Sequence, residues 1–216
     1  DATRSIHVNG MGHEIDQTFI KGLIGGMCLD QIVNNYIQPC QMDSGTRRDD
    51  NTNGILSSGK NYTDMEHKWD EAFGYLYGQV DNAKTTDLST NLSSTGTTLF
   101  KYLTKIEGSN DPGIAKRIFD AFKLGRAAIV AGAYDVRDAQ ANILKIQLSK
   151  VIGYKSVDYL EGYMSKMAAG NTADAFHALS EGYGFIMSLQ FTNDGNDAPY
   201  FTKAEVDGML SKLSNF

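Results

Sequence analysis

Two segments of the chain place a histidine and carboxylates at the same spacing. Residues 64–76 and residues 174–186 both read D-x-x-H-x-x-x-E-x-aromatic-G-aromatic-aliphatic. On an α-helix, side chains three or four residues apart lie on one face, so each segment would present an imidazole beside carboxylates. The predicted metal ligands are His67, Glu71, His177 and Glu181, and the predicted supporting residues are Asp64, Asp70, Asp174 and Arg126.

Imidazole and carboxylate together are ligands of several transition metals. A mixed set of this kind suits Fe, Zn or Mn about equally and does not identify the metal, for which Fe or Zn are the candidates. Helical bundles that hold two metal ions project histidine and glutamate inward from facing helices. The repeated pattern therefore predicts a metal site, provided that the two histidine-bearing faces do not point into solvent in different directions.

Two other interpretations of these residues stay open. The polar face of an amphipathic helix is commonly no more than its solvated side. The carboxylates could instead belong to a buried polar network without a metal ion. The residues that could neutralise or extend such a network are Arg126, Arg137, Asp135 and Asp138.

Apolar residues recur at helical spacing through most of the chain, and no convincing alternating strand is found. The predicted fold class is therefore all-α, a bundle of six to eight helices in a single domain over residues 1–216. The expected helices cover residues 14–38, 63–78, 98–107, 111–131, 135–167, 172–190 and the segment from 202 onward.

Several helix starts have local signals. Capping boxes predict helices that begin after Thr63 and after Thr202. Asp111 followed by proline predicts a capped helix with a first-turn proline. Residues 41–61 and 81–98 are polar and predict connections between helices.

The repetition extends beyond the histidine segments. The pattern F-x-x-G-x-x-[GA] occurs at residues 19–25 and again at residues 122–128. This predicts an ancient duplication, with two pseudo-repeated bundles over about residues 12–80 and 112–190. Glycine weakens a helix by up to about 1 kcal/mol relative to alanine. The glycines of residues 19–25 are therefore expected to have a structural use, which is to let another helix approach closely.

Composition limits the classes of function. Lys and Arg total 20 against 26 Asp and Glu, which gives a net charge of −6. Binding to nucleic acid needs a basic face, so nucleic acid is not an expected partner. No run of about 18 apolar residues occurs, so no transmembrane helix is expected. Cys28 and Cys40 are expected to be free thiols, because a helix through this segment would hold them beyond disulfide reach.

Four stretches of the chain resemble one family of proteins. Residues 59–75, 121–129, 176–185 and 200–207 look like an uncharacterised family of secreted bacterial lipoproteins, a domain of unknown function. The resemblance covers most of the chain. It implies an exported protein of the periplasm or cell surface, with its lipid anchor on a cysteine upstream of Asp1.

More distantly, the chain is similar to imelysin-like proteins, the iron-regulated or insulin-cleaving group. These proteins are all-helical, consist of two related bundles and carry G-x-H-x-x-E. His67 and His177 match the histidine of this motif, whereas Met65 and Ala175 stand where it has glycine. An acidic residue three positions after the histidine is present in the first segment only, as Asp70. The resemblance implies a link to iron uptake.

These observations predict an exported metal-binding protein that serves iron acquisition and has no catalytic role. Its expected partner is a metal ion or an outer-membrane partner protein. The first alternative is a metal-dependent hydrolase resembling a peptidase, with Glu71 as general base. The second is a cell-surface interaction module without a metal ion. An exposed patch of Tyr75, Tyr77, Tyr183 and Phe185 would favour the second alternative.

Overall fold

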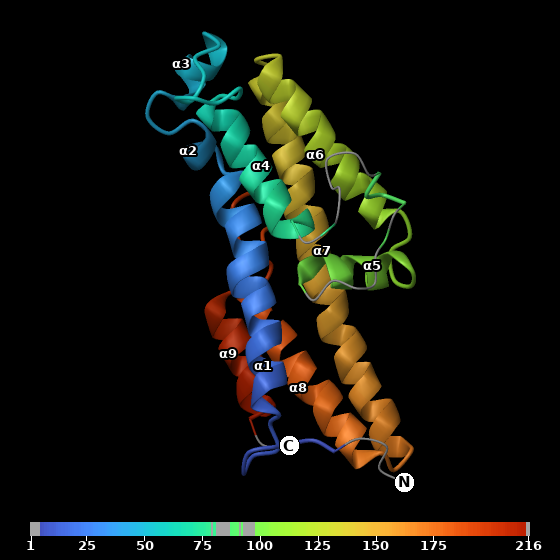
Figure 1. Cartoon of the computed structure of the whole chain (residues 1–216). Helices are drawn as coiled ribbons and strands as arrows, with labels where there is room; N and C mark the ends of the chain where they lie inside the picture. Colours follow the sequence, from blue (N-terminus) through green and yellow to red (C-terminus); the bar gives the residue numbers. More distant parts are fainter. Residues whose placement is uncertain (1–4, 79, 81–86, 91, 93–97, 215–216) are drawn as a thin grey trace.

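A computed structural model of the protein describes residues 5–78, 80, 87–90, 92 and 98–214, and all regular structure among them is helical (Figure 1). This confirms the all-α fold class and the helical bundle. The α-helices are α1 (Ile15–Leu23), α2 (Pro39–Met42), α3 (Arg47–Thr52), α4 (Asp64–Tyr77), α5 (Leu99–Glu107), α6 (Ile114–Val130), α7 (Tyr134–Ala168), α8 (Thr172–Ser188) and α9 (Lys203–Lys212). The π-helical segments are η1 (Ile24–Leu29) and η2 (Gln31–Tyr36), and η3 (Leu189–Phe191) is a 3₁₀ turn.

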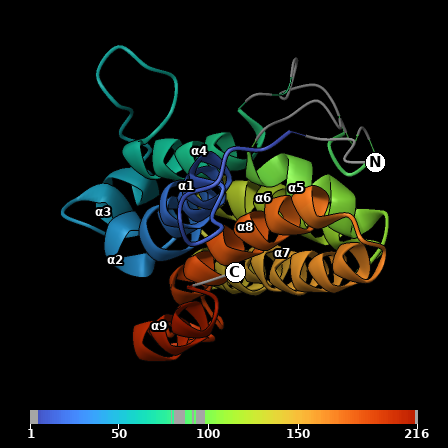
Figure 2. The same cartoon turned by 90° about the horizontal axis from the view of Figure 1, so that it is seen from below.

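The longest helix, α7, runs the length of the bundle. Its 35 residues rise about 52 Å at 1.5 Å per residue. α6 packs beside its first half and α8 beside its second half (Figure 1). α4 contacts α6, and α1 contacts α8. α9 lies at the edge of the bundle, where it contacts α8 (Figure 2).

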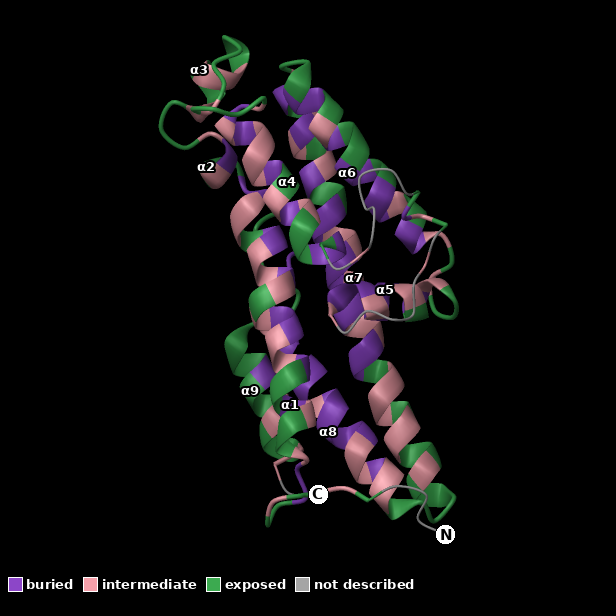
Figure 3. Ribbon diagram, viewed as in Figure 1, coloured by how far each residue is buried: buried purple, intermediate pink, exposed green. Residues whose placement is uncertain are grey.

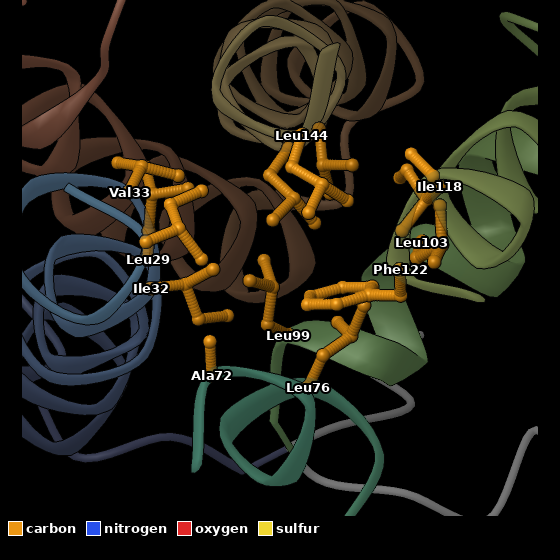
Figure 4. Close-up of a cluster of buried hydrophobic side chains, with 14 of the residues drawn as sticks. Leu29, Ile32, Val33, Ala72, Leu76, Leu99, Leu103, Ile118, Phe122 and Leu144 are labelled. Atoms are coloured by element: carbon orange, nitrogen blue, oxygen red, sulfur yellow. The ribbon is translucent and has the colours of Figure 1, made fainter. Parts of the chain in front are cut away.

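Buried side chains from helices far apart in the sequence meet in one hydrophobic core. Leu29, Leu76, Leu99, Phe122 and Leu144 belong to five different elements and are almost completely buried (Figure 4). The purple faces in Figure 3 show the same inward orientation along α4, α6 and α7. The core therefore joins the first part of the chain to the last and fixes the faces that remain outside.

The segment predicted as one helix over residues 14–38 is helical but changes geometry along its length. After α1 the backbone continues through η1 and η2, so that the amide of Ile37 donates to the carbonyl of Ile32 at 3.3 Å. Close approach by another helix is confirmed at Gly25. A Cβ added there would lie 2.2 Å from the Cβ of Ser188 in α8.

The prediction that residues 41–61 form a connection is wrong in part. The end of α2 and the whole of α3 lie within this range, and α3 has no buried residue. Because α3 buries nothing, it has no apolar periodicity that could reveal it. Asn51 holds it in place by donating to the carbonyl of Ile129 at 2.8 Å and to the hydroxyl of Tyr134 at 3.0 Å. The other predicted connection, residues 81–98, lies mostly outside the described residues.

Both predicted capping boxes are confirmed, because Thr63 and Thr202 exchange side-chain and backbone hydrogen bonds with the glutamates three residues later. The predicted cap at Asp111 is wrong. α6 is preceded by Gly113, whose φ of 89° is left-handed. The carboxylate of Glu107 caps this helix by accepting from the amides of Gly113 and Ala115, both at 2.8 Å.

Two expectations about the whole chain agree with the structure. Cys28 and Cys40 are free thiols, and burial raises the pKa of the Cys28 thiol. Within the described residues, no helix combines the length and the apolar character needed to cross a membrane.

Candidate functional site

The two histidine-bearing segments lie in different parts of the bundle. The first is α4, which contacts α3 and α6, and the second is α8, which contacts α1 and α9 (Figure 1). His67 contacts Tyr62 and Glu71, whereas His177 contacts Glu14 and Glu181. Each histidine therefore has its own carboxylate partner, and these contacts do not join the four predicted ligands in one cluster.

The His67 cluster lies at the surface. The His67 side chain is 41% exposed, and its Nε2 lies 3.5 Å from Oε1 of Glu71. The imidazole stacks on Tyr62 at a centroid distance of 5.1 Å. Lys68 binds the other oxygen of Glu71 at 2.8 Å. The carboxylate thus already has a cation partner.

The predicted supporting residues on α4 also have cation partners. Asp64 forms an ion pair with Arg47 of α3. Arg126 of α6 binds Asp70 at 2.9 Å through Nε and Glu66 at 2.7 Å through Nη1. Arg126 therefore does neutralise carboxylates of this segment, and these ion pairs tie α4 to its neighbours α3 and α6.

The His177 cluster is more buried and joins three elements. Nδ1 of His177 lies 2.6 Å from Oε2 of Glu14, which precedes α1, and Nε2 lies 3.3 Å from Oε2 of Glu181. Lys21 of α1 binds Oε1 of Glu181 at 3.0 Å. The hydroxyl of Tyr159 in α7 donates to the same oxygen at 3.1 Å. The side chains of His177, Glu14, Glu181 and Lys21 are all less than one-fifth exposed.

Glu14, like Lys21 and Tyr159, is a member of this cluster that the sequence pattern missed. It lies 163 positions from His177 and outside both repeated segments. Its position is fixed by its backbone amide, which donates to the hydroxyl of Ser180 in α8 at 2.9 Å. In the sequence, Glu14 stands out only because it immediately precedes the first helix. Its contact with His177 depends on the packing of α1 on α8, which the sequence pattern does not predict.

The His177 cluster has the geometry of an ion-pair network. The two nitrogens of an imidazole point in different directions, and each faces a different carboxylate here. An ionised carboxylate only accepts hydrogen bonds. Both ring nitrogens can therefore donate to their carboxylates only when each of them carries a hydrogen atom. Burial and the charge of Glu181 raise the pKa of Tyr159, so its hydroxyl remains a donor. Among the residues that the structure describes, no three His, Cys, Asp or Glu side chains are grouped so as to hold a metal ion.

The two repeated segments have different surroundings although their sequences correspond. Gly74 of α4 faces open space, because a Cβ there would meet nothing within 4 Å. The corresponding Gly184 of α8 faces α1, and a Cβ would lie 2.6 Å from the carbonyl oxygen of Thr18 and 2.9 Å from the amide nitrogen of Gly22. The face with Gly184 is thus an interhelical contact, whereas the face with Gly74 is a surface.

The glycine-bearing segments of the two predicted repeats each pack against a helix of the other repeat. Gly125 of α6 accommodates the indole of Trp69 in α4, where a Cβ would lie 2.1 Å from the ring. Gly25, which follows α1, accommodates Ser188 of α8 in the same manner. The glycine-bearing segment of each predicted repeat therefore packs on the histidine-bearing helix of the other. The duplication itself stays a prediction.

The aromatic patch considered for a binding surface is not present. Tyr77 and Phe185 are completely buried, whereas Tyr75 is 37% exposed. Tyr77 packs among the core rings of Phe100 and Phe122. The four aromatic residues therefore do not form one surface patch, because α4 and α8 turn some of them toward the core.

A different apolar surface lies between α7, the end of α8 and α9. It is a groove of about 630 Å³, within the range of about 300–1,000 Å³ that small-molecule sites occupy. Val157 is 53% exposed and Phe201 is 36% exposed, so large apolar side chains of the groove meet solvent. The groove is lined by Lys150, Gly153, Tyr154, Ser156, Val157, Leu160, Ile186, Leu189, Phe201, Met209, Lys212 and Leu213.

Gly153 gives this groove part of its depth. It lies in the middle of α7, and a Cβ there would meet nothing within 4 Å. Glycine is unfavourable inside a helix, so its presence is a signal that sequence reasoning could have used. The gap that it leaves faces the groove.

The described residues form an all-helical bundle with a partly buried ion-pair cluster and an apolar groove at its edge. The chain belongs to the family described as the domain of unknown function DUF4856, whose sequence profile matches residues 1–215. The expectation of an uncharacterised family is thereby confirmed. Comparison with curated proteins and with solved structures found no match for the chain.

Proposed function

We propose that this protein is a binding protein whose groove between α7, α8 and α9 takes an apolar ligand. The observation that carries the proposal is the groove itself, about 630 Å³ with an almost entirely apolar lining. Exposed apolar surface of this kind marks sites of ligand or partner binding. This proposal belongs to the class of interaction modules that do not need a metal ion.

Ser156, a polar residue of the groove lining, already has a hydrogen-bond partner, which favours an apolar ligand. The hydroxyl of Ser156 donates to the carbonyl of Ile152 at 2.9 Å, within its own helix. Ile186 and Leu189 supply apolar surface from the end of α8 and from η3. A ligand that covers this surface removes apolar area from water, and each Å² so buried stabilises the complex by about 25 cal/mol.

Filling the groove should abolish binding without harming the fold. In a Gly153→Met variant the new side chain would occupy the groove, so affinity for the neutral fluorophore N-phenyl-1-naphthylamine should fall at least about tenfold. Methionine is a better helix former than glycine, so the melting temperature should stay the same or rise. Fluorescence titration and thermal unfolding measure the two quantities.

Gly162→Met is the matched control on the same helix. A Cβ at Gly162 has only Lys166 Nζ nearby, at 3.9 Å, and the residue does not line the groove. This variant should bind the fluorophore as the unchanged protein does. Equal affinity in both variants would show that the ligand does not bind in the groove.

The place of action is proposed from resemblance. The similarity to secreted bacterial lipoproteins supports a protein of the periplasm or cell surface. Fractionation of cells that produce the full-length protein, with detection by antibody, tests this. Recovery in the soluble cytoplasmic fraction would contradict it.

Metal binding for iron acquisition is the second candidate function. The observation that favours it is Glu14, a second carboxylate beside His177 and Glu181. To hold a metal ion, Glu14 and Glu181 would have to turn toward one nitrogen of the imidazole, and Lys21 would have to leave Glu181. The distant resemblance to imelysin-like proteins supports the same function.

Metal content separates this candidate from the ion-pair network. If His177 holds a metal ion, protein purified without chelators or a histidine tag should contain nearly stoichiometric Fe, Zn or Mn. A His177→Ala variant should then lose it, while His67→Ala keeps it, because His67 lies in a separate surface cluster. Mass spectrometry of the purified proteins measures this. No metal in any of them, even after Fe, Zn or Mn is added, would exclude the metal site.

A further inference from the structure

The length of the groove corresponds to one hydrocarbon chain. On α7 its lining runs from Lys150 to Leu160. Ten residue steps at 1.5 Å correspond to about 15 Å. The hydrocarbon core of a bilayer is about 30 Å thick, so the acyl chains of one leaflet also extend about 15 Å.

The groove offers about 630 Å³ along this length, within the range of small-molecule sites. A single flexible hydrocarbon chain is a ligand of that class.

Both charged residues that line the groove are positive. Lys150 and Lys212 are the charged residues among those that line it, and none of the described lining residues is acidic. The chain as a whole has a net charge of −6, so this local excess of positive charge is opposite to the overall balance.

Both lysine side chains reach solvent, although Lys150 also has an ion-pair partner. Lys150 is 40% exposed and lies 3.7 Å from Asp111, whose other carboxylate oxygen is bound by Arg117 at 2.6 Å. Lys212 forms no ion pair with another described residue and is exposed. An ammonium group at the end of an apolar groove matches an anionic group at the end of an apolar chain.

We infer that the groove takes a single-chain anionic amphiphile, such as a long-chain fatty acid. Its chain lies on Gly153, Val157, Leu160 and the apolar face of α9, and its head group binds Lys150 or Lys212. This inference rests on the proposed function of the groove, and it adds the chemical class of the ligand.

Displacement of the fluorophore by oleate and by oleyl alcohol tests the inference. The two molecules have the same chain, and only oleate is charged at pH 8. Both are used below the concentration at which they aggregate. In the unchanged protein oleate should bind about tenfold more tightly than oleyl alcohol, the effect expected from one charge-assisted hydrogen bond. Added salt should weaken oleate binding and leave oleyl alcohol binding unchanged.

Replacing the lysines should remove the preference for oleate. In a Lys150→Met/Lys212→Met variant the two ligands should bind with equal affinity, and the single variants identify which lysine holds the head group. Lys203→Met is the control, because Lys203 lies on α9 outside the groove and pairs with Asp207 at 2.6 Å. It should keep the full preference.

Three results would overturn all or part of this. Equal binding of oleate and oleyl alcohol by the unchanged protein would contradict the anionic head group and leave the apolar groove as a binding site. A preference for oleate that persists in the double variant would show that the two lysines do not bind the head group. Failure of both ligands to displace a fluorophore that the groove binds would contradict the single-chain ligand.

Discussion

Replacing Asp43 with alanine is expected to lower the free energy of unfolding by about 3 kcal/mol. Asp43 binds the guanidinium of Arg137 through two hydrogen bonds, of 2.7 Å and 3.0 Å. The Arg137 side chain is completely buried, and its remaining carboxylate partner, Asp138, is 41% exposed. Loss of one partner leaves a buried cation that is only partly neutralised, which is the costly way to break a buried ion pair.

Urea denaturation of the variant measures this effect. Asp207→Ala is the control, because Asp207 forms an exposed pair with Lys203 on α9. Exposed pairs contribute about 0–1 kcal/mol, so this variant should unfold almost as the unchanged protein does. An equally small effect at Asp43 would mean that the buried pair does not stabilise the bundle.

The same pair predicts how stability depends on pH. The hydrogen bonds from Arg137 hold the pKa of the Asp43 carboxyl below its usual range. Its contribution is complete above the pKa of an unfolded aspartate, about 3.9, and is lost as pH falls through the lower folded pKa. The unchanged protein should therefore lose more stability between about pH 5 and pH 2 than the Asp43→Ala variant does.

Replacing Gly184 with alanine is expected to destabilise the protein by about 2 kcal/mol. The new Cβ would lie 2.6 Å from the carbonyl oxygen of Thr18 and 2.9 Å from the amide nitrogen of Gly22. These are backbone atoms of α1, which cannot turn aside as the end of a side chain can. α1 and α8 would have to separate, and the contacts between Glu14 and His177 would weaken with them.

Gly74→Ala is the matched control, because Gly74 occupies the same position of the repeated sequence pattern. Gly74 is exposed and a Cβ there meets nothing within 4 Å, so alanine should stabilise α4 by about 0.5–1 kcal/mol. Thermal unfolding should thus shift in opposite directions in the two variants. A similar destabilisation at both glycines would contradict the different surroundings of the two segments.

The fold was predictable where a local signal defines it. Thr63 and Thr202 begin their helices as the capping boxes predict, because both partners of a capping box lie within four residues. α3 was missed because it buries no residue, and the cap of α6 was misassigned because Glu107 reaches it from the previous helix. Local sequence does not contain these longer-range contacts.

The candidate site was less predictable than the fold. The spacing of His177 and Glu181 correctly predicts that they share one face of a helix. In the structure, Nε2 of His177 lies 3.3 Å from Oε2 of Glu181. The spacing does not predict Glu14, because that contact depends on how α1 packs on α8. It also does not distinguish the exposed His67 from the more buried His177, since the same pattern occurs in both segments. The groove was missed because its lining comes mainly from three separate helices, α7, α8 and α9.

The most direct test of the apolar groove is to find where a neutral long chain binds. A long-chain alcohol with a photoreactive diazirine can be crosslinked to the protein and the labelled peptides identified by mass spectrometry. We expect labels on residues 150–160 of α7 and on residues 209–213 at the end of α9, and their loss in the Gly153→Met variant. Labels that persist in this variant, or that lie on the exposed apolar residues Ile15, Phe19 and Met27 instead, would contradict a binding site in the groove.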